Sequence, residues 1–298
     1  MIGRKRETLK MSRIAIMGIL GSIAVSALVA LAVSADTVQK AGLPAIVWCV
    51  IGAFVIQWIV FVHSWITRSE KFFDLTGSAT YILMTVLALL LADDIEPRDV
   101  LIAALVWIWA ARLGTYLFRR ISADGHDGRF DKIKTNFGQL LMTWTIQGMW
   151  VSLTAIAAWT AITTETTADF GVVGIVGVVV WVIGFAIEVR ADTEKSAFKA
   201  DPANEGRFIS SGIWAWSRHP NYFGEITLWT GMALLALAAF DGWEHVALIS
   251  PVFVTLLLTR ISGIPMLERR GLKRWGSDPD YQEYLAETPV LILRPPRR

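Results

Sequence analysis

Residues 217–225, SRHPNYFGE, hold a cation, an imidazole, an amide, a phenol and a carboxylate within nine positions. Pro220 suits the first turn of a helix, with a polar residue just before it near the cap. The start of a helix presents backbone N–H groups and a partial positive charge to a ligand. Asn221 and Glu225 lie four residues apart, so a helix places them on one face. This stretch is predicted either to bind a ligand or to anchor a helix at the membrane surface.

Polar side chains also lie in or beside three apolar segments, where a charge at membrane depth costs roughly 2.5–3.5 kcal/mol. Each of them could reach the membrane surface or form an internal ion pair. All of these polar residues are expected near the same side of the membrane. We therefore favour the interpretation that they line a single cavity. Helical spacing puts the members of each set on one face: Arg112, Tyr116 and Arg119; Gln147 alone; and Glu188, Asp192, Lys195 and Lys199.

The mouth of this predicted cavity is rich in cations, which suit phosphate because a guanidinium contacts phosphate oxygens in a bidentate way. Carboxylates such as Glu188, Asp192 and Glu225 could accept hydrogen bonds from sugar hydroxyls or from an amide. A nucleotide cofactor with an apolar co-substrate fits both features, and neither a nucleic acid partner nor a metal site is expected. The candidate cations are Arg119, Arg120, Arg129, Lys132, Lys134, Lys195, Lys199 and Arg207.

Membrane helices are needed to position these residues. The chain has 298 residues, of which 54% are hydrophobic and 18% charged, whereas soluble domains carry about 25% charged residues. Its single cysteine, Cys49, excludes a disulfide framework and a cysteine-based zinc site. A bilayer is spanned by about 20 apolar residues. Eight segments qualify, and the last two are short enough to form a helical hairpin: 14–34, 43–62, 75–92, 100–118, 138–162, 170–189, 226–240 and 246–261.

The distribution of cations predicts the orientation of these helices. With the N-terminus assigned to the cytoplasm, 25 of the 28 lysines and arginines fall on the inner side, and only Lys40 and Arg98 lie in outer loops. Positive charge is retained inside in membrane proteins. We therefore expect an all-α polytopic bundle of seven to eight transmembrane helices, with both termini cytoplasmic.

Several stretches resemble the steroid 5-alpha-reductase-like membrane family, in its bacterial branch. The resemblance covers most of the chain from about residue 72 and implies a seven-helix reductase in the bacterial inner membrane, with NADPH in a cytoplasm-facing site. Residues 1–42 would then be an N-terminal tail with an extra helix, 43–298 the reductase-like domain, and about 184–298 its cofactor-binding half. The stretches are FFDLTGSATY (72–81), RLGTYLFRRI (112–121), GRFDKIK (128–134), GFAIEVRAD (184–192), SGIWAWSRHPNYFGEI (211–226) and SGIPMLERRGLKRWG (262–276).

The resemblance also implies roles for particular residues. The family's cofactor-contacting Asn-x-x-Gly-Glu pattern matches Asn221 and Glu225, and its Asn and Asp pair matches Glu188 and Asp192, with one departure. Its phosphate-reading arginines fall near Arg112, Arg119 and Arg120, and its mid-helix glutamine matches Gln147. We assign to the same cofactor site Tyr116, Arg129, Lys195, Lys199, Arg218, His219, Tyr222 and Glu268.

The catalytic group departs from the family's pattern. In the family, hydride passes from the nicotinamide to the β carbon of an enone while an acidic group polarises the 3-oxo oxygen. Steroid reductases use a Gln-Glu pair at a helix start and a tyrosine on a later helix. Here the helix start carries Asp74 without a preceding glutamine, and Trp109 stands at the tyrosine position. Asp74, as a carboxylic acid kept neutral by apolar surroundings, or Tyr81, two turns later, is the predicted donor.

Two other functions fit parts of the sequence. RHPNYFGE also resembles the C-terminal motif of membrane isoprenylcysteine and phospholipid methyltransferases, which bind S-adenosylmethionine. That cofactor has no phosphate, so the many cations favour NADPH. A lipid-binding or transport protein without enzymatic activity would need no nucleotide. The expected partners of the enzyme are the membrane and an apolar lipid or steroid that enters from the bilayer.

Overall fold

The computed structural model describes residues 11–166 and 171–296. Two compact units make up the chain. The first unit comprises Met1–Ala168 with Ala239–Ala247, and the second comprises Asp169–Ala238 with Leu248–Arg298. We describe each unit by itself.

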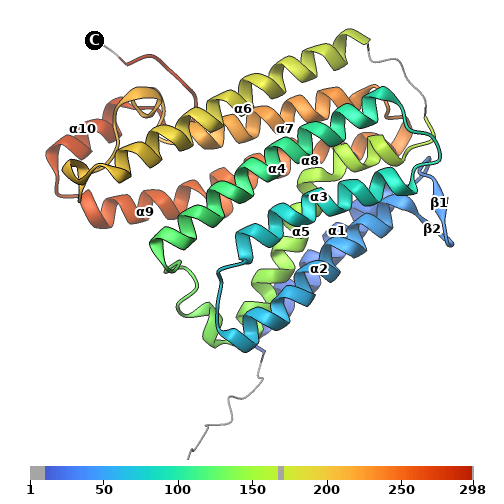
Figure 1. Cartoon of the computed structure of the whole chain (residues 1–298), viewed down its shortest axis with the longest axis horizontal. Helices are drawn as coiled ribbons and strands as arrows, with labels where there is room; N and C mark the ends of the chain where they lie inside the picture. The colour runs from blue at the N-terminus through green and yellow to red at the C-terminus, as the bar shows by residue number, and fades with distance from the viewer. Residues whose placement is uncertain (1–10, 167–170, 297–298) are drawn as a thin grey trace, which may run out of the picture. The chain divides into compact units, whose positions relative to one another are not determined.

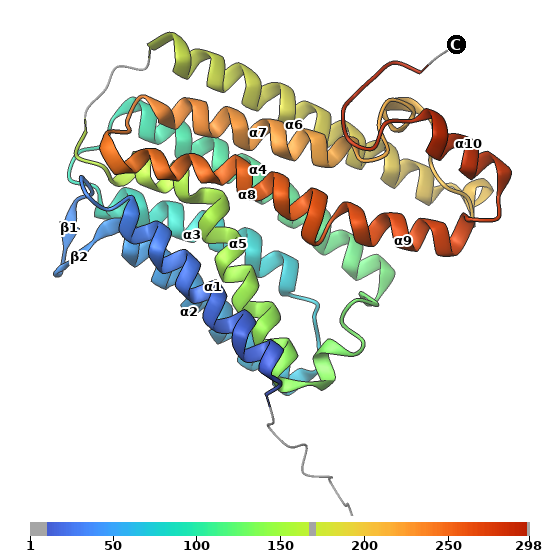
Figure 2. The same ribbon diagram turned by 180° about the vertical axis from the view of Figure 1, so that it is seen from behind.

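The first unit is built around the central helix α5 (Phe137–Thr163), which contacts the four other long helices of the unit (Figures 1 and 2). Most of α5 is buried, with small and apolar side chains on all sides, as expected for a helix in the middle of a bundle. The other elements are α1 (Arg13–Ala32), the hairpin β1 (Gln39–Lys40) and β2 (Leu43–Pro44), α2 (Ala45–Thr67), α3 (Phe73–Leu91), α4 (Pro97–Asp124), η1 (Ile133–Thr135) and η4 (Gly242–Leu248).

Local signals in the sequence explain where helices of the first unit begin. The Asn136 side chain caps α5 by accepting from the Gln139 amide at 3.0 Å. Glu96 and Asp99 form a reciprocal capping box at the start of α4, where Pro97 fills the first helical position. Both arrangements satisfy backbone N–H groups that a helix start leaves without partners.

The second unit contains the long antiparallel pair α6 (Gly171–Ala200) and α7 (Pro220–Leu237), which lie side by side in Figures 1 and 2. Glycines allow this close approach: a Cβ added at Gly224 would lie 2.7 Å from the Gly184 carbonyl oxygen, and one at Gly177 would lie 2.7 Å from that of Gly231. The remaining elements are η2 (Pro202–Asn204), η3 (Gly212–Ala215), α8 (Ile249–Leu256), the π-helical η5 (Leu257–Ile261), α9 (Ile264–Trp275) and α10 (Pro279–Glu287).

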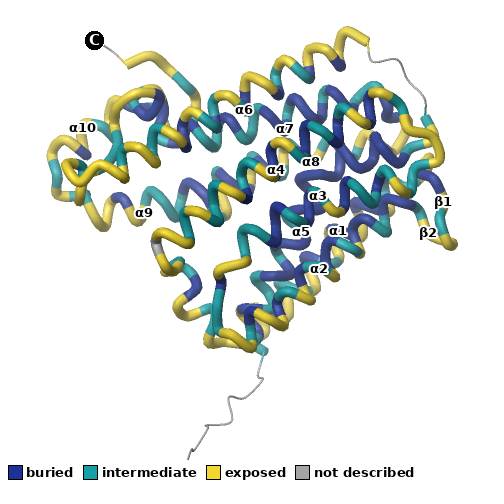
Figure 3. The backbone as a smooth tube through the Cα atoms, viewed as in Figure 1, coloured by how far each residue is buried: buried dark blue, intermediate teal, exposed yellow. Residues whose placement is uncertain are grey.

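Seven helical segments among the described residues are long and apolar enough to cross a membrane. They match the first six predicted segments and, for the last, Gly242–Trp275. The 18-residue helix α7 is not among the seven, and it begins six residues before the predicted segment 226–240. Large apolar side chains on α1 and α6 are exposed, for example Ile14 and Val172, both at 76%. Such a surface suits contact with lipid (Figure 3). The predicted all-α polytopic membrane bundle is confirmed.

Candidate functional site

The stretch 217–225 forms a bend and the first turns of α7, as its sequence predicts. Pro220 is the first residue of α7, and the Ser217 hydroxyl oxygen accepts from the His219 amide at 3.1 Å. The Ser217 hydroxyl also donates to the Leu291 carbonyl at 2.8 Å, and the Arg218 amide donates to the Pro289 carbonyl at 2.9 Å. The backbone before α7 is therefore held in place by the C-terminal segment of the same unit.

Glu268 on α9 links two side chains of this bend. Arg218 Nη1 donates to Glu268 Oε2 at 2.8 Å, and His219 Nε2 lies 3.0 Å from Glu268 Oε1. His219 is buried and stacks on the Tyr222 ring with centroids 5.7 Å apart. We call Arg218, His219 and Glu268 the α7 cluster. The sequence identified all three as candidates but did not show that they meet.

The protonation state of His219 follows from its surroundings. Burial lowers the pKa of His219, the hydrogen bond and charge of Glu268 raise it, and the nearby cations Lys195 and Arg218 lower it further. The result lies below the ordinary histidine pKa, so His219 is neutral at pH 7. An ionised carboxylate only accepts hydrogen bonds. His219 Nε2 is therefore the donor to Glu268, and Nδ1 carries the lone pair.

Three buried polar atoms at this bend have no hydrogen-bond partner within the described part of the chain: His219 Nδ1, Arg218 Nε and Asn221 Oδ1. An unsatisfied buried polar group costs about 1–3 kcal/mol, and such groups in folded proteins call for a specific reason. A ligand that supplies the missing partners is one such reason. These atoms make the start of α7 the best candidate for a binding site in the second unit.

Helix α6 contributes acidic residues beside this turn. Glu188 and Asp192 are both buried on one face of α6, as their spacing predicts. A Cβ added at Gly224 would lie 2.6 Å from the Glu188 amide nitrogen, so Glu188 lies directly against the turn that carries Asn221 and Glu225. Further along α6, the Lys195 ammonium lies 4.5 Å from the Trp214 ring centroid, and Lys199 is exposed.

In the first unit, three predicted residues meet at the start of α3. Asp74 lies in the first turn of α3 and forms an ion pair with Arg120 of α4, with 3.7 Å between carboxylate and guanidinium. Gln147 of α5 donates from Nε2 to the Phe73 carbonyl at 2.8 Å, next to Asp74. Two turns along α3, the buried Tyr81 packs edge-on against Trp109 of α4, with ring centroids 5.0 Å apart.

The predicted cofactor-binding residues of the first unit differ in whether an acidic partner already balances their charge. Arg112, Tyr116 and Arg119 lie within α4, where the spacing places them on one face. Arg119 is exposed and forms no ion pair or hydrogen bond in the described ranges. Arg129, by contrast, donates from Nε to Asp127 Oδ2 at 2.6 Å, so a carboxylate already balances its charge.

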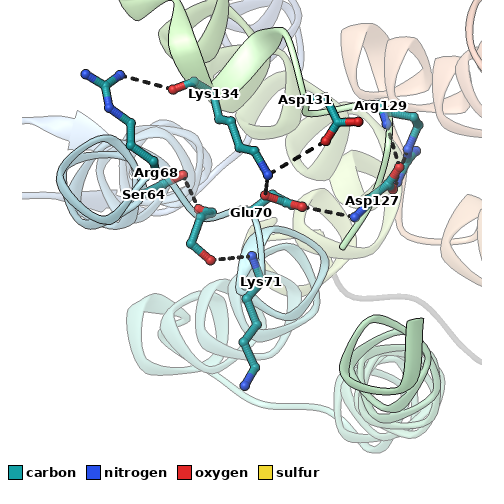
Figure 4. A network of polar contacts seen from close by, with 9 residues as sticks. Ser64, Arg68, Glu70, Lys71, Asp127, Arg129, Asp131 and Lys134 are labelled. Atoms are coloured by element: carbon teal, nitrogen blue, oxygen red, sulfur yellow. Dashed lines mark hydrogen bonds and ion pairs between the residues drawn. The ribbon is translucent and has the colours of Figure 1, made fainter. Parts of the chain in front are cut away.

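Arg129 belongs to a network of charged residues that was not predicted from the sequence (Figure 4). Lys134 Nζ contacts Glu70 Oε2 at 3.0 Å, and Glu70 Oε1 accepts from the Asp127 amide at 3.0 Å. We call Glu70, Asp127, Arg129 and Lys134 the loop network, because they join the segment between α2 and α3 to the segment between α4 and α5. The acids Glu70 and Asp127 were missed, although each stands within two residues of a cation in the sequence.

The contacts of the loop network explain the ionisation of its acids. Burial alone would raise the pKa of Glu70, but hydrogen bonds from the Asp127 amide and from Lys134 outweigh it and lower the pKa below its usual value. For Asp127, burial also acts to raise the pKa, and the hydrogen bonds and charge of Arg129 lower it by more. Both side chains are ionised at neutral pH.

Comparison with known proteins shows which family the chain belongs to. The family described as "Protein of unknown function (DUF1295)" matches residues 58–288 of the chain. The chain belongs to the DUF1295 family. The DUF1295 match includes the loop network and the α7 cluster, and residues 1–42 lie before it. Comparisons with curated proteins and with solved structures found no match.

Proposed function

We propose that this DUF1295 protein is an NADPH-dependent membrane oxidoreductase that reduces the carbon–carbon double bond of a 3-oxo-4-ene steroid or a similar lipid enone. The observation that carries the proposal is the set of buried polar atoms at the start of α7 that lack partners within the described residues. They lie in one of the stretches that resemble the steroid 5-alpha-reductase family.

The residues around the start of α7 fit a pyridine nucleotide. Asn221 Oδ1 and His219 Nδ1 are buried acceptors, and Arg218 Nε is a buried donor. The buried acids Glu188 and Asp192 would accept from ribose hydroxyls or from the carboxamide. Lysines would meet the phosphates, with Lys195 and Lys199 on α6 as the candidates of this unit. The resemblance alone adds Arg112, Arg119 and Arg120 of α4.

Bound NADPH would supply a hydride to the β carbon of the enone, and the α carbon would then take up a proton to complete the reduction. As that bond forms, negative charge develops on the carbonyl oxygen, and a donor from the protein lowers the barrier by roughly 2.7–4 kcal/mol. Asp74 and Tyr81 lie two turns apart on α3 and are the two candidate donors. Asp74 pairs with Arg120 at 3.7 Å, so it can donate only in its protonated form. Tyr81 packs against Trp109, which stands where the resemblance expects the family's tyrosine. This contact supports Tyr81 as the replacement for that residue.

The proposal includes a place in the cell. The resemblance to the bacterial branch of the family implies the bacterial inner membrane. The positive-inside distribution of lysines and arginines supports an orientation in which the cofactor site faces the cytoplasm. An apolar substrate would then reach the first unit from the bilayer.

Ligand analysis of the purified protein tests the proposal against its alternative, an S-adenosylmethionine-dependent membrane methyltransferase. We expect mass spectrometry of the extracted ligands to find NADP(H), and titration to show binding of NADPH and not of S-adenosylmethionine. NADPH oxidation with progesterone as the enone probe then tests the reaction. The matched variants Asn221→Ala and Glu225→Ala should weaken NADPH binding while the protein stays folded and inserted. Binding of S-adenosylmethionine instead would overturn the oxidoreductase assignment.

A further inference from the structure

The exposed side chains of the second unit change from apolar to basic along the segment that runs from α8 through η5 into α9 (Figure 2). On α8, Val252 and Leu256 are exposed, and their spacing of four residues puts them on one face of the helix. From Arg260 to the end of α9, five of the seven exposed residues are cations. We call the four exposed cations of α9 the basic face: Arg269, Arg270, Lys273 and Arg274.

This segment is longer than the hydrocarbon core of a bilayer. The apolar span Gly242–Trp275 has 34 residues, and at 1.5 Å per helical residue such a length extends about 51 Å. A hydrocarbon core is about 30 Å thick, so part of the segment lies outside it. Because charges at membrane depth are costly, the end that carries the basic face is the end that leaves the core. The lipid headgroups are the first surroundings that this end meets.

The opposite face of α9 packs within the second unit. Glu268, Gly271 and Trp275 follow one another at spacings of three and four residues, so they share a face. Glu268 belongs to the α7 cluster, and Gly271 lies so close to Tyr281 of α10 that an added Cβ would clash with the tyrosine hydroxyl. Trp275 donates from Nε1 to the Gly206 carbonyl at 2.6 Å. The basic face therefore points away from this packing.

Nothing within α9 balances the charge of the basic face. Glu268 is the only acid of α9, and it is already bound within the α7 cluster. No cation of the basic face forms an ion pair in the described part of the chain. Arg269 and Lys273 stand four residues apart, as do Arg270 and Arg274, and like charges at this spacing destabilise a helix. An anionic partner would offset that repulsion.

Helix geometry directs the basic face toward the membrane. The Cα–Cβ bonds of a helix tilt toward its N-terminus, and the N-terminal end of α9 is the end joined to the apolar α8 through η5. Long arginine and lysine side chains can thus reach back to the level of the lipid phosphates. A guanidinium contacts phosphate oxygens in a bidentate way. A cluster of four or more cations directly after a membrane helix is typical of proteins that bind anionic lipids.

We propose that the basic face of α9 binds anionic phospholipid headgroups of the cytoplasmic leaflet, and that these lipids stabilise the protein. A zwitterionic lipid offers the same phosphate but carries a cation next to it, so the basic face selects lipids with a net negative charge. The proposal does not rest on the proposed reaction, because it uses none of the residues assigned to the cofactor or to the enone.

Thermal unfolding of the whole purified protein in detergent tests this proposal. The protein is titrated with phosphatidylglycerol or with phosphatidylcholine of the same chain length. We expect phosphatidylglycerol to raise the unfolding midpoint at a concentration about tenfold to a hundredfold lower than phosphatidylcholine requires. Each cation near an anionic surface contributes about fivefold in affinity. The double variant Arg269→Gln with Lys273→Gln should therefore reduce this preference by about tenfold or more, and high salt should reduce it in the unaltered protein.

Two further variants separate the basic face from charge in general. Arg190→Gln with Arg294→Gln removes the same charge from exposed positions of the second unit outside α9, and it should keep the preference. Arg269→Lys with Arg270→Lys conserves the charge and should also keep it. Without added lipid, the double glutamine variant should unfold at no lower temperature than the unaltered protein, because one repulsion between like charges is removed. That midpoint shows that the variant is folded.

The outcomes distinguish this inference from the proposed function. If the two lipids act at equal concentrations, or if the Arg190 and Arg294 variant loses the preference as well, the inference is wrong. If inorganic pyrophosphate raises the midpoint as phosphatidylglycerol does, the basic face binds a soluble phosphate and the inference is also overturned. NADPH binding without a lipid preference would leave the proposed function in place. A lipid preference confined to the basic face, in a protein that binds no NADPH, would support this inference and contradict the proposed function.

Discussion

Two charged clusters of this protein differ in whether their polar atoms all have hydrogen-bond or ion-pair partners. In the loop network of the first unit, Glu70, Asp127, Arg129 and Lys134 all have partners at 3.0 Å or less. In the α7 cluster of the second unit, Glu268 binds two neighbours, yet three buried atoms at that bend lack partners among the described residues. Charge alone thus does not mark a ligand site, because charges that already pair with one another do not need a ligand to balance them.

This difference indicates a structural role for the loop network and a ligand-binding role for the α7 cluster. The loop network joins two interhelical segments and suits a structural role, since its carboxylates are held by backbone and side-chain donors (Figure 4). The α7 cluster orients donors and acceptors that the chain itself does not use. If this comparison is correct, changes in the loop network should affect stability, and changes around α7 should affect binding.

The largest expected effect is all-or-none and concerns the side of the membrane on which each cluster lies. In a Cys49→Ala background, we expect Lys71→Cys, beside the loop network, and Arg270→Cys, on the helix of Glu268, to react with an impermeant maleimide only from the cytoplasmic side. Asp94→Cys should react only from the opposite side. All three positions are exposed. Labelling of Arg270→Cys together with Asp94→Cys would mean that α7, which is not among the seven apolar spans, does not cross the membrane.

The next largest effect concerns the start of α3, which carries the proposed chemistry. Removing the donor to a developing oxyanion costs roughly 2.7–4 kcal/mol, so either Asp74→Asn or Tyr81→Phe should slow NADPH oxidation in a single turnover by about a hundredfold to a thousandfold. NADPH affinity should stay within a few-fold. Asp127→Asn is the control, since Asp127 belongs to the loop network. Normal rates in both test variants would exclude both donors.

A smaller effect on NADPH affinity is expected to distinguish Arg119, which has no ion pair among the described residues, from Arg129, which has one. Arg119 forms no ion pair in the described ranges, whereas Arg129 donates to Asp127 at 2.6 Å. A charge-assisted phosphate contact contributes roughly 1.5–3 kcal/mol. We therefore expect Arg119→Gln to weaken NADPH by about tenfold to a hundredfold and NADH much less. Arg129→Gln should change both little. An equal loss for the two nucleotides in Arg119→Gln would argue against a 2′-phosphate contact, and a large loss in Arg129→Gln would break the comparison.

The sequence predicted the fold well, because apolar length and cation placement are properties of the chain itself. It predicted Pro220 at the start of α7 from the fixed backbone angle of proline. It did not predict the π-helical turn at Leu257–Ile261, which leaves no composition signal. The capping box of Glu96 and Asp99 was also not predicted, although its acidic residues stand three apart around Pro97 in the sequence.

The candidate site was predicted only in part, since spacing gives faces and not partners. Glu188 and Asp192 share a face as their spacing requires. The contact of Gln147 with the Phe73 carbonyl joins residues 74 positions apart, and Glu268 reaches Arg218 across 50 positions. Such pairings depend on how helices pack. The partner of Arg129 is only two residues away, so a check for local neutralisation of each cation would have found Asp127.

The smallest effect measures the loop network against pH. The pKa values of Glu70 and Asp127 lie below their ordinary values, which are about 4.3 and 3.9. Their contribution to stability is therefore complete above those values and is lost as the pH falls through the lower folded values. We expect the thermal unfolding midpoint in detergent to fall as the pH is lowered from about 5 to about 3.

Lys134→Met sharpens this last prediction. Glu70 is 6% exposed and loses its cation in this variant, while the hydrogen bond from the Asp127 amide remains. We therefore expect a loss of about 1–3 kcal/mol of unfolding free energy at pH 7. The loss should shrink at low pH, because Glu70 is then protonated and Lys134 no longer stabilises it. Arg190→Met, which removes an exposed pair with Glu194, should cost little. NADPH affinity should be unchanged in both variants. A tenfold weaker affinity in Lys134→Met at unchanged stability would show that the loop network, like the α7 cluster, holds a ligand.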